Sequence, residues 1–355
     1  MKILITGACG FAGATLAECL LGFQPELDIL GVDNFMRAGS ETNRSKLRAL
    51  GVRVQHADLR NSEDLTALPP VDFVLDAAAN PSVLAGVGTG GSSRSLMDHN
   101  LVGTINILEY CKVHRAGLIL LSTSRVYSIE PLAKLALEVE RDAFRPNEKA
   151  SFPRGMSPAG VTEEFSTGAP ISLYGATKIC AESLALEYAL TFGFPVWINR
   201  LGVLAGAGQF GKADQGIFSF WIHSCARRKP LKFIGFGGHG YQVRDCLHPR
   251  DLAPILLHQM KNAPAPGQWV CNFSGGTKNS MSLRQLHTWC EARFGATAVE
   301  RVADDRPFDL PWLVLDSDFA NQAYNWRPET SILKVLEEIA LHAEENPHWL
   351  ECTTT

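Results

Sequence analysis

Two side chains of the segment Tyr174-Gly175-Ala176-Thr177-Lys178 could together transfer a proton. Tyr174 and Lys178 are four residues apart at the start of a predicted helix, which places them on the same face of it. A nearby ammonium group stabilises a phenolate, so we expect Lys178 to lower the pKa of Tyr174. Tyr174 could then accept a proton from a substrate hydroxyl group. Because this spacing also occurs by chance, the interpretation needs support from other parts of the chain.

A hydroxyl group at the end of a predicted strand supports it. Thr123 directly follows the apolar run Leu118–Ser122, which we expect to be a buried strand. The carboxyl ends of parallel strands form the ligand crevice of an open α/β sheet, so Thr123 could hydrogen-bond the reacting oxygen. A simple backbone cap is the alternative role for this threonine. We predict Thr123, Tyr174 and Lys178 as the catalytic residues.

A glycine-rich turn lies at the beginning of the chain, between a predicted strand and a predicted helix. Its glycines are Gly7, Gly10 and Gly13. The first permits a tight turn, the second lets the backbone approach a pyrophosphate, and the third lets helix and strand pack closely. The phosphates would then lie at the positive end of the helix, on its unpaired N–H groups. This pattern predicts a dinucleotide site.

An acidic residue stands where such a site needs one. Asp33 lies 20 residues after Gly13, at the end of the second predicted strand. Its carboxylate can accept hydrogen bonds from the ribose hydroxyls and would repel a 2′-phosphate, so we predict NAD as the cofactor rather than NADP. Arg37 could weaken that preference. Asp58, after the third strand, is predicted to contact the adenine edge, with a helix cap before Asn61 as the alternative.

Strands and helices alternate through the first half of the sequence. Such an order implies right-handed crossovers and a parallel sheet covered on both faces, so we predict an α/β fold: a Rossmann-type doubly wound parallel sheet with a smaller mixed α+β substrate lobe. The expected strands are Lys2–Thr6, Leu27–Asp33, Val52–Ala57, Phe73–Ala77, Leu118–Ser122 and Val196–Arg200, and the main helices are Phe11–Leu21, Ser92–His114 and Tyr174–Phe192.

The pattern of elements also predicts the domains. Residues 1–200 form the expected NAD-binding domain, and residues 201–355 form the expected substrate-binding lobe, with some segments returning to the first domain. Within the first part, residues 128–171 contain several prolines and a charged section, and we expect a loop-rich insertion there.

Composition excludes several classes of partner. The chain has 33 basic and 37 acidic residues and a formal net charge of -4, so it has no field that would attract nucleic acid or an anionic membrane surface. Its nine cysteines form no CxxC pair, which favours buried reduced thiols and no metal site. The first strand leaves no room for a signal peptide and no apolar run could span a bilayer, so we expect a cytoplasmic protein.

The order of these motifs resembles the extended short-chain dehydrogenase/reductases, the NAD-dependent epimerase/dehydratase family that includes the UDP-galactose 4-epimerase-like enzymes. The resemblance implies a triad of Thr123, Tyr174 and Lys178, a nucleotide-sugar substrate, and a homodimer formed through two helices of the first domain. Asn100 matches an "N-x-x-G-T" segment near the cofactor. Further NAD contacts are expected from residues in the glycine turn and at strand ends: Phe11, Ala12, Asn34, Leu59, Ala77, Ala78, Ala79 and Arg200.

In the second half, two arginines match the family's phosphate-binding positions. Arg244 in Gln242–His248 and Arg306 are implied to contact the pyrophosphate of the nucleotide-sugar, and surface ion pairing is the alternative for each. A narrower resemblance is to the CDP-paratose 2-epimerases. It implies reaction at C2 of a CDP-linked deoxysugar, and its matching segments add three substrate contacts, namely Arg125, Gln209 and Gln215.

The implied chemistry is epimerisation. Bound NAD takes hydride from a sugar carbon while Tyr174 removes the hydroxyl proton, and hydride returns to the opposite face of the keto-sugar. A sugar-nucleotide 4,6-dehydratase would carry Asp-Glu directly after Thr123, where this chain has Ser124-Arg125. A 4-epimerase, a decarboxylase and a reductase remain alternatives because they share the triad. A non-catalytic NAD-sensing regulator is the alternative from another class, although it would be free to lose Tyr174 or Lys178.

Overall fold

The computed structural model describes residues 1–87, 92–265 and 267–353. The chain divides into two compact units. The first contains residues 1–126, 173–200 and 249–271, and the second contains residues 127–172, 201–248 and 272–355. The functional division near residue 200, into an NAD-binding and a substrate-binding domain, stays a prediction.

A seven-stranded sheet carries the first unit. Its apolar strands are buried on both faces, as expected where helices cover both sides, and the strands from β5 to β3 pair in parallel. This confirms the predicted Rossmann-type α/β fold. The strand order is β13 (Val270–Phe273), β10 (Val196–Leu201), β5 (Gly117–Thr123), β4 (Phe73–Asp76), β1 (Lys2–Thr6), β2 (Asp28–Asp33) and β3 (Arg53–His56).

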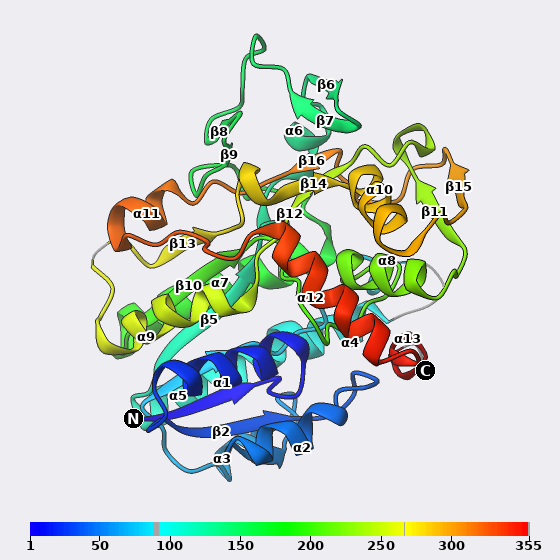
Figure 1. Cartoon of the computed structure of the whole chain (residues 1–355). Coiled ribbons are helices and arrows are strands. Elements are labelled where there is room, and N and C mark those ends of the chain that lie inside the picture. The colour runs from blue at the N-terminus through cyan, green and yellow to red at the C-terminus, as the bar shows by residue number, and fades with distance from the viewer. Residues whose placement is uncertain (88–91, 266, 354–355) are drawn as a thin grey trace. The chain divides into compact units, whose positions relative to one another are not determined.

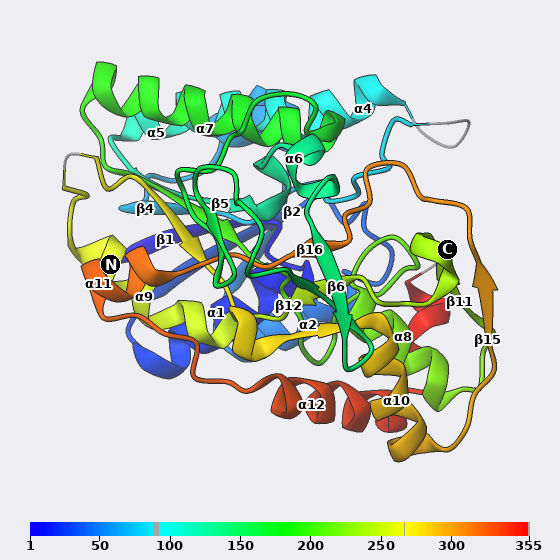
Figure 2. The same cartoon turned by 90° about the horizontal axis from the view of Figure 1, so that it is seen from above.

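Helices cover both faces of this sheet (Figure 1). Helices α1 (Phe11–Phe23) and α9 (Ala253–Lys261) pack together on one face, while α5 (Gly103–His114) and α7 (Ser172–Phe192) lie on the other (Figure 2). The hydroxyl of Tyr188 on α7 donates a hydrogen bond of 2.6 Å to Glu109 Oε1 on α5. The short helices α2 (Thr42–Ala49) and α3 (Ser62–Thr66) follow β2 and β3.

The helix predicted from Ser92 to His114 contains a change of winding. Helix α4 (Ser93–Met97) passes into a π turn at Asp98–Val102 before α5 begins. Such turns are frequent at functional sites. Here the turn carries Asn100, whose side chain is buried.

The second unit is a mixture of small sheets and helices around its own apolar core. Helix α8 packs against α10 and α12, with Trp221, Phe233 and Leu336 fully buried among them. Its elements are the sheet β14 (Ser280–Ser282), β12 (Val243–Asp245) and β16 (Trp312–Leu313), the pair β11 (Leu231–Ile234) and β15 (Val299–Val302), and the helices α8 (Ile217–Ala226), α10 (Leu283–Phe294), α11 (Asp318–Tyr324), α12 (Ile332–Glu345) and α13 (Trp349–Cys352).

The predicted insertion belongs to the second unit and has more regular structure than expected. It contains helix α6 and two hairpins, while most of its residues lie in loops, as the sequence predicts. The proline-rich pattern hid these elements because each is only two to five residues long. They are α6 (Ile129–Ala133), β6 (Leu137–Glu140) paired with β7 (Ala143–Pro146), and β8 (Met156–Ser157) paired with β9 (Gly160–Val161).

Helix length and polarity bear on membrane insertion. Within the described residues, no helix is both long enough and apolar enough to cross a bilayer. Even the 21-residue helix α7 carries the charged residues Lys178, Glu182 and Glu187.

Candidate active site

Tyr174 and Thr123 meet at the carboxyl end of the sheet, within the first unit. Tyr174 lies in the first turn of α7 and Thr123 is the last residue of β5, and the side chain of Thr123 lies near enough to the Tyr174 hydroxyl to lower its pKa. Tyr174 is only 6% exposed. Burial raises the pKa of Tyr174, while the hydroxyl of Thr123 and the charge of Arg125 lower it. The sequence-predicted pair of hydroxyls is therefore present.

Lys178 makes other contacts than the sequence predicts. Its Nζ donates a hydrogen bond of 3.1 Å to the main-chain oxygen of Leu121. Burial lowers the pKa of Lys178, and the carboxylates of Asp76 and Glu182 oppose that effect. In this structure Thr123 and Arg125 lower the pKa of Tyr174, and the expected effect of Lys178 on that pKa stays a prediction. The spacing places both residues on one face but does not fix where a long ammonium side chain ends.

A buried ion pair lies on the same side of α7 as Lys178. Glu182 accepts a hydrogen bond of 2.6 Å from Arg200 Nη2 and further bonds from Arg200 Nε, and it also accepts one from the hydroxyl of Ser122. Glu182 and Arg200 are 4% and 7% exposed. Arg200, predicted to contact NAD, therefore has its guanidinium engaged with Glu182.

The glycine turn forms a backbone cradle of the kind that a pyrophosphate requires. A Cβ on Gly13 would lie 2.3 Å from the carbonyl oxygen of Gly7, and one on Gly7, whose φ is +58°, would lie 2.9 Å from Ala78 Cα. Only glycine fits at these two positions. Helix α1 begins directly after Gly10, and Gly10 has no side chain that could cap the first N–H groups of the helix. Phe11 and Ala12 supply its first N–H groups, so the turn fits the phosphates of a dinucleotide.

Asp33 is oriented at the end of β2 by the backbone. Its Oδ2 accepts a hydrogen bond of 2.9 Å from Cys9 N, and its Oδ1 accepts one of 2.8 Å from Phe35 N. Each carboxylate oxygen can accept a second bond, so ribose hydroxyls could still be bound. Burial raises the pKa of Asp33 and these N–H groups lower it. Arg37 lies in the loop that follows, where its carbonyl oxygen accepts a bond of 3.0 Å from Ser40 N.

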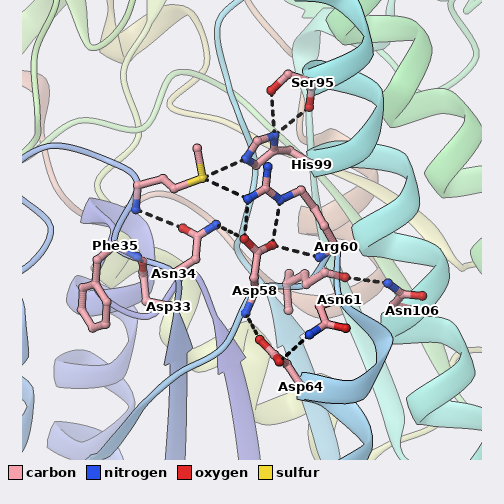
Figure 3. A network of polar contacts seen from close by, with 12 residues as sticks. Asp33, Asn34, Phe35, Asp58, Arg60, Asn61, Asp64, Ser95, His99 and Asn106 are labelled. Carbon is pink, nitrogen blue, oxygen red and sulfur yellow. Dashed lines mark hydrogen bonds and ion pairs between the residues drawn. The ribbon is translucent and has the colours of Figure 1, made fainter.

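Asp58 is the centre of a polar network at the end of β3 (Figure 3). Its Oδ2 accepts a bond of 2.5 Å from Arg60 Nη2, and its Oδ1 accepts one of 2.9 Å from Arg60 Nε. Asn34 Nδ2 donates to Oδ2 at 3.3 Å. These contacts, Arg60 first, hold the pKa of Asp58 well below its usual range. Helix α3 is capped by Asn61, so Asp58 is not its cap.

Leu59 contributes to the same edge through its backbone. Its carbonyl oxygen accepts a hydrogen bond of 2.7 Å from Asn106 Nδ2 on α5 (Figure 3). The sulfur of Met36 lies 3.4 Å from Arg60 Nη2 and 3.3 Å from His99 Nε2. The loops after β2 and β3 and the π turn before α5 are thus joined at the predicted adenine edge.

Asn100 links the segment after β4 to the predicted catalytic helix. Its Oδ1 accepts a bond of 2.8 Å from Asn80 N, and its Nδ2 donates at 3.2 Å to the hydroxyl of Thr177. Thr177 in turn donates to the main-chain oxygen of Tyr174 at 2.7 Å. Ala77, Ala78 and Ala79 precede Asn80 and lie between this link and the glycine turn.

Four predicted substrate residues belong to the second unit. Arg244 Nη2 is 2.6 Å from Asp309 Oδ1 in a largely buried ion pair, and Arg306 Nη1 donates to a main-chain oxygen at 3.0 Å. This buried pair differs from the surface ion pairing that was the alternative role of Arg244. Gln209 Nε2 donates to Leu204 O at 2.7 Å, and Gln215 exchanges backbone bonds with Lys212. The phosphate and sugar contacts of all four stay predictions.

Sequence reasoning missed four residues that surround the predicted ones, namely Arg60, Asp76, Ser122 and Glu182. Two signals were available. Asp76 is a charged residue at the end of the apolar run Phe73–Ala77, and Glu182 lies four residues after Lys178 on one helical face. Neither signal identifies the partner, because the partners come from strands distant in sequence.

The chain is similar to known proteins along nearly its whole length. The chain is 29% identical to CDP-paratose 2-epimerase of Salmonella typhi over 347 residues, which cover 93% of this chain and 96% of that protein. It is 28% identical to UDP-glucuronate 4-epimerase of Thermodesulfobacterium geofontis, covering 97% and 96%. The crystal structure of UDP-glucuronic acid 4-epimerase from Bacillus cereus with UDP-glucuronic acid and NAD matches with a TM-score of 0.76 at 24% identity, covering 97% of this chain and 99% of that one.

A family model decides the assignment. The model of the NAD dependent epimerase/dehydratase family matches residues 3–271, which is most of the chain. This range includes the glycine turn, Thr123, Tyr174 and Lys178. The prediction of an NAD-dependent enzyme with this fold is thereby confirmed, and the chain belongs to the NAD dependent epimerase/dehydratase family.

Proposed function

We propose that this protein epimerises a nucleotide-linked sugar by transient oxidation, with C2 of a CDP-linked deoxysugar as the reacting carbon. The observation that carries the proposal is the position of the buried Tyr174 beside Thr123 at the carboxyl end of the sheet. The similarity to CDP-paratose 2-epimerase of Salmonella typhi along nearly the whole chain supports the choice of sugar.

In this proposal, Tyr174 transfers the proton. Its phenolate oxygen accepts the proton of the sugar hydroxyl during oxidation and returns it during reduction, while Thr123 holds the same sugar oxygen. The guanidinium of Arg125 favours the phenolate form of Tyr174, since its charge lowers the pKa of that group. Lys178 is assigned to the nicotinamide ribose.

The NAD site is proposed at the turn of Gly7, Gly10 and Gly13, with Asp33 accepting the ribose hydroxyls and Asp58 at the adenine edge. When bound there, NAD supplies a hydride acceptor that gives the hydride back to the opposite face of the sugar. Arg244, Arg306, Gln209 and Gln215 are proposed to bind the nucleotide-sugar, and Arg125 is proposed to contact its sugar.

A second candidate reaction is 4-epimerisation of a UDP-linked sugar. The relative from Thermodesulfobacterium geofontis is a UDP-glucuronate 4-epimerase and is 28% identical along nearly the whole chain, which supports this candidate almost as well. Both reactions use the same proton transfer at Tyr174, so only the product separates them.

We further propose that the protein is a homodimer through α5 and α7. Large apolar side chains are exposed at the carboxyl ends of these helices, with exposed fractions of 70% for Val113, 67% for Leu190 and 46% for Phe192. The variant Leu190→Glu places a charge in this surface. Light scattering after size exclusion should give it the mass of a monomer, whereas the wild type should have the mass of a dimer.

The first test has two stages. The purified protein is denatured and the released nucleotide is identified by mass spectrometry, with near-stoichiometric NAD expected. The intact protein is then incubated with CDP-linked deoxysugars and UDP-glucuronate, and the products are identified by NMR. Tyr174→Phe should keep its NAD and lose turnover by about 100-fold or more. A protein that binds NAD but converts none of these sugars would contradict the proposal.

A further inference from the structure

We propose that Asp76 is a positioning residue that holds Lys178 in place relative to the glycine-rich turn of the cofactor site. The inference rests on the proposed function in one respect, the assignment of Lys178 to the nicotinamide ribose. Asp76 was not among the residues expected from the sequence, and the proton transfer proposed for Tyr174 does not use it.

The first observation is the place of Asp76 in the sheet. It is the last residue of β4 and pairs in register with Thr6 on one side and Leu120 on the other. Its exposed fraction is 2%, although it carries a carboxyl group. Buried carboxylates are costly unless they are bonded or paired with a charge, so a side chain at this point needs partners.

The partners lie on both sides of Asp76. The hydroxyl of Thr6 donates a hydrogen bond of 2.5 Å to Asp76 Oδ1, and Ala78 N donates one of 3.1 Å to the same hydroxyl. Thr6 is the residue directly before Gly7, so this bond connects Asp76 to the glycine turn. On its other side, Asp76 interacts with the charge of Lys178. Lys178 in turn donates a hydrogen bond to the main-chain oxygen of Leu121, and Leu121 directly follows Leu120, the residue of β5 that pairs with Asp76.

Lys178 is thereby held from three directions. Leu121 O accepts its hydrogen bond from β5, Asp76 attracts its charge from β4, and Glu182 attracts it from α7. Glu182 is itself engaged by Arg200. Asp76 instead interacts with Thr6, Ala78 and Lys178, and no arginine pairs with it in the part of the chain that the structure describes.

The other titratable group that faces Asp76 is the thiol of Cys111 on α5. Burial and the charge of Asp76 both raise the pKa of that thiol, so it stays neutral and adds no second negative charge beside Asp76. Burial raises the pKa of Asp76 and lowers that of Lys178, and the charge of each opposes the effect of burial on the other. Removing the carboxylate charge should therefore let Lys178 lose its proton at a lower pH.

The test compares three single variants of the full chain. Asp76→Asn keeps the shape and removes the charge, and Asp76→Glu keeps the charge. The matched control is Asp72→Asn, since Asp72 directly precedes β4 at its opposite end and accepts a hydrogen bond of 2.7 Å from Lys2 N.

The first readout is the dissociation constant for NAD, measured by calorimetry on protein freed of its nucleotide. We expect Asp76→Asn to raise it by about tenfold, the effect of one weakened charge-assisted contact, and Asp72→Asn to leave it unchanged. Asp76→Glu should restore most of the affinity. This readout needs no sugar turnover, so it stays valid if the proposed epimerase reaction fails.

The second readout is the pH dependence of NAD binding and of turnover. In Asp76→Asn, NAD binding and turnover should both begin to fall at a lower pH than in the wild type, because Lys178 loses its proton earlier. In a variant that only loosened the fold, the pH of this fall would not change. If Asp76→Asn does not fold, Thr6→Val removes the hydroxyl that holds Asp76 and should weaken NAD binding in the same direction. Wild-type affinity and an unmoved alkaline limit in the folded variants would overturn the proposal.

Discussion

The ammonium of Lys178 donates a hydrogen bond of 3.1 Å to the main-chain oxygen of Leu121. This bond directs the side chain toward the end of β5 and the buried carboxylates of Asp76 and Glu182. Tyr174 lies one turn earlier on the same helix, and its pKa is lowered by the hydroxyl of Thr123 and by the charge of Arg125. The two residues of the motif thus have separate surroundings, which lets each be tested alone.

The charge of Arg125 should set the pH range of Tyr174. Because the guanidinium lowers the pKa of Tyr174, Arg125→Met should raise that pKa and move the rising limb of the pH–rate profile to higher pH. Arg125→Lys keeps a positive charge and should move the limb less. An Arg125→Met profile that overlays the wild type would refute the assigned role of this charge.

The glycine turn should tolerate no side chain at its third glycine. Gly13→Ala places a Cβ 2.3 Å from the carbonyl oxygen of Gly7. We expect it to lower the free energy of unfolding by about 1–3 kcal/mol and to reduce the amount of NAD that the protein retains. Gly22 lies on the same helix with open space around it, so Gly22→Ala should stabilise by about 0.5–1 kcal/mol. Thermal unfolding and nucleotide content measure both effects, and equal behaviour of the two variants would contradict the cradle.

The ion pair between Asp58 and Arg60 should contribute a stability that depends on pH. The pKa of Asp58 is depressed in the folded chain, so its contribution is complete above the unfolded value near ~4 and is lost as the pH falls through the folded value. Arg60→Ala should lose about 1 kcal/mol or less at pH 7, since the arginine is partly exposed. Urea unfolding should show the difference from wild type shrinking below about pH 4.

Arg53 provides the control for that measurement. Its ion pair with Asp28 spans 3.0 Å and is more exposed than the pair of Asp58 and Arg60. Arg53→Ala should therefore change stability less than Arg60→Ala at pH 7. A constant difference for Arg60→Ala from pH 7 to pH 3 would argue against the depressed pKa of Asp58.

Asp245 should stabilise the second unit. It is 1% exposed and accepts hydrogen bonds from the hydroxyl of Ser274, from Val203 N at 3.1 Å and from Leu315 N at 3.2 Å. Asp245→Asn turns an NH2 group toward these donors and should cost about 1–3 kcal/mol in urea unfolding. The exposed Asp304→Asn is the control and should be neutral. Equal midpoints for the two variants would contradict this role.

The sequence predicts the framework of the site well. The strand ends at Thr6 and Asp33 follow from short apolar runs, because a buried parallel strand is apolar throughout and stops where polar residues begin. The strand predicted to end at Ser122 continues by one residue, to Thr123. The same rule brings Gly7 and Thr123 to one edge, since the carboxyl ends of parallel strands lie together.

The contacts of the charged side chains could not be predicted in this way. Arg60 turns back onto Asp58, and Asp76 interacts with a lysine roughly a hundred residues later in the chain. Such partners depend on strand order and side-chain direction, which local periodicity does not encode. The i to i+4 spacing of Tyr174 and Lys178 fixed their shared face, yet the Nζ of Lys178 ends at Leu121 O.

The central claim is transient oxidation with return of the same hydride. We would incubate the protein, with only the NAD it retains on purification, with CDP-paratose carrying deuterium at C2, and analyse the product by NMR and mass spectrometry. The proposal predicts a C2 epimer that keeps its deuterium without added coenzyme. Loss of the deuterium to water, or conversion only when coenzyme is supplied and consumed, would contradict it.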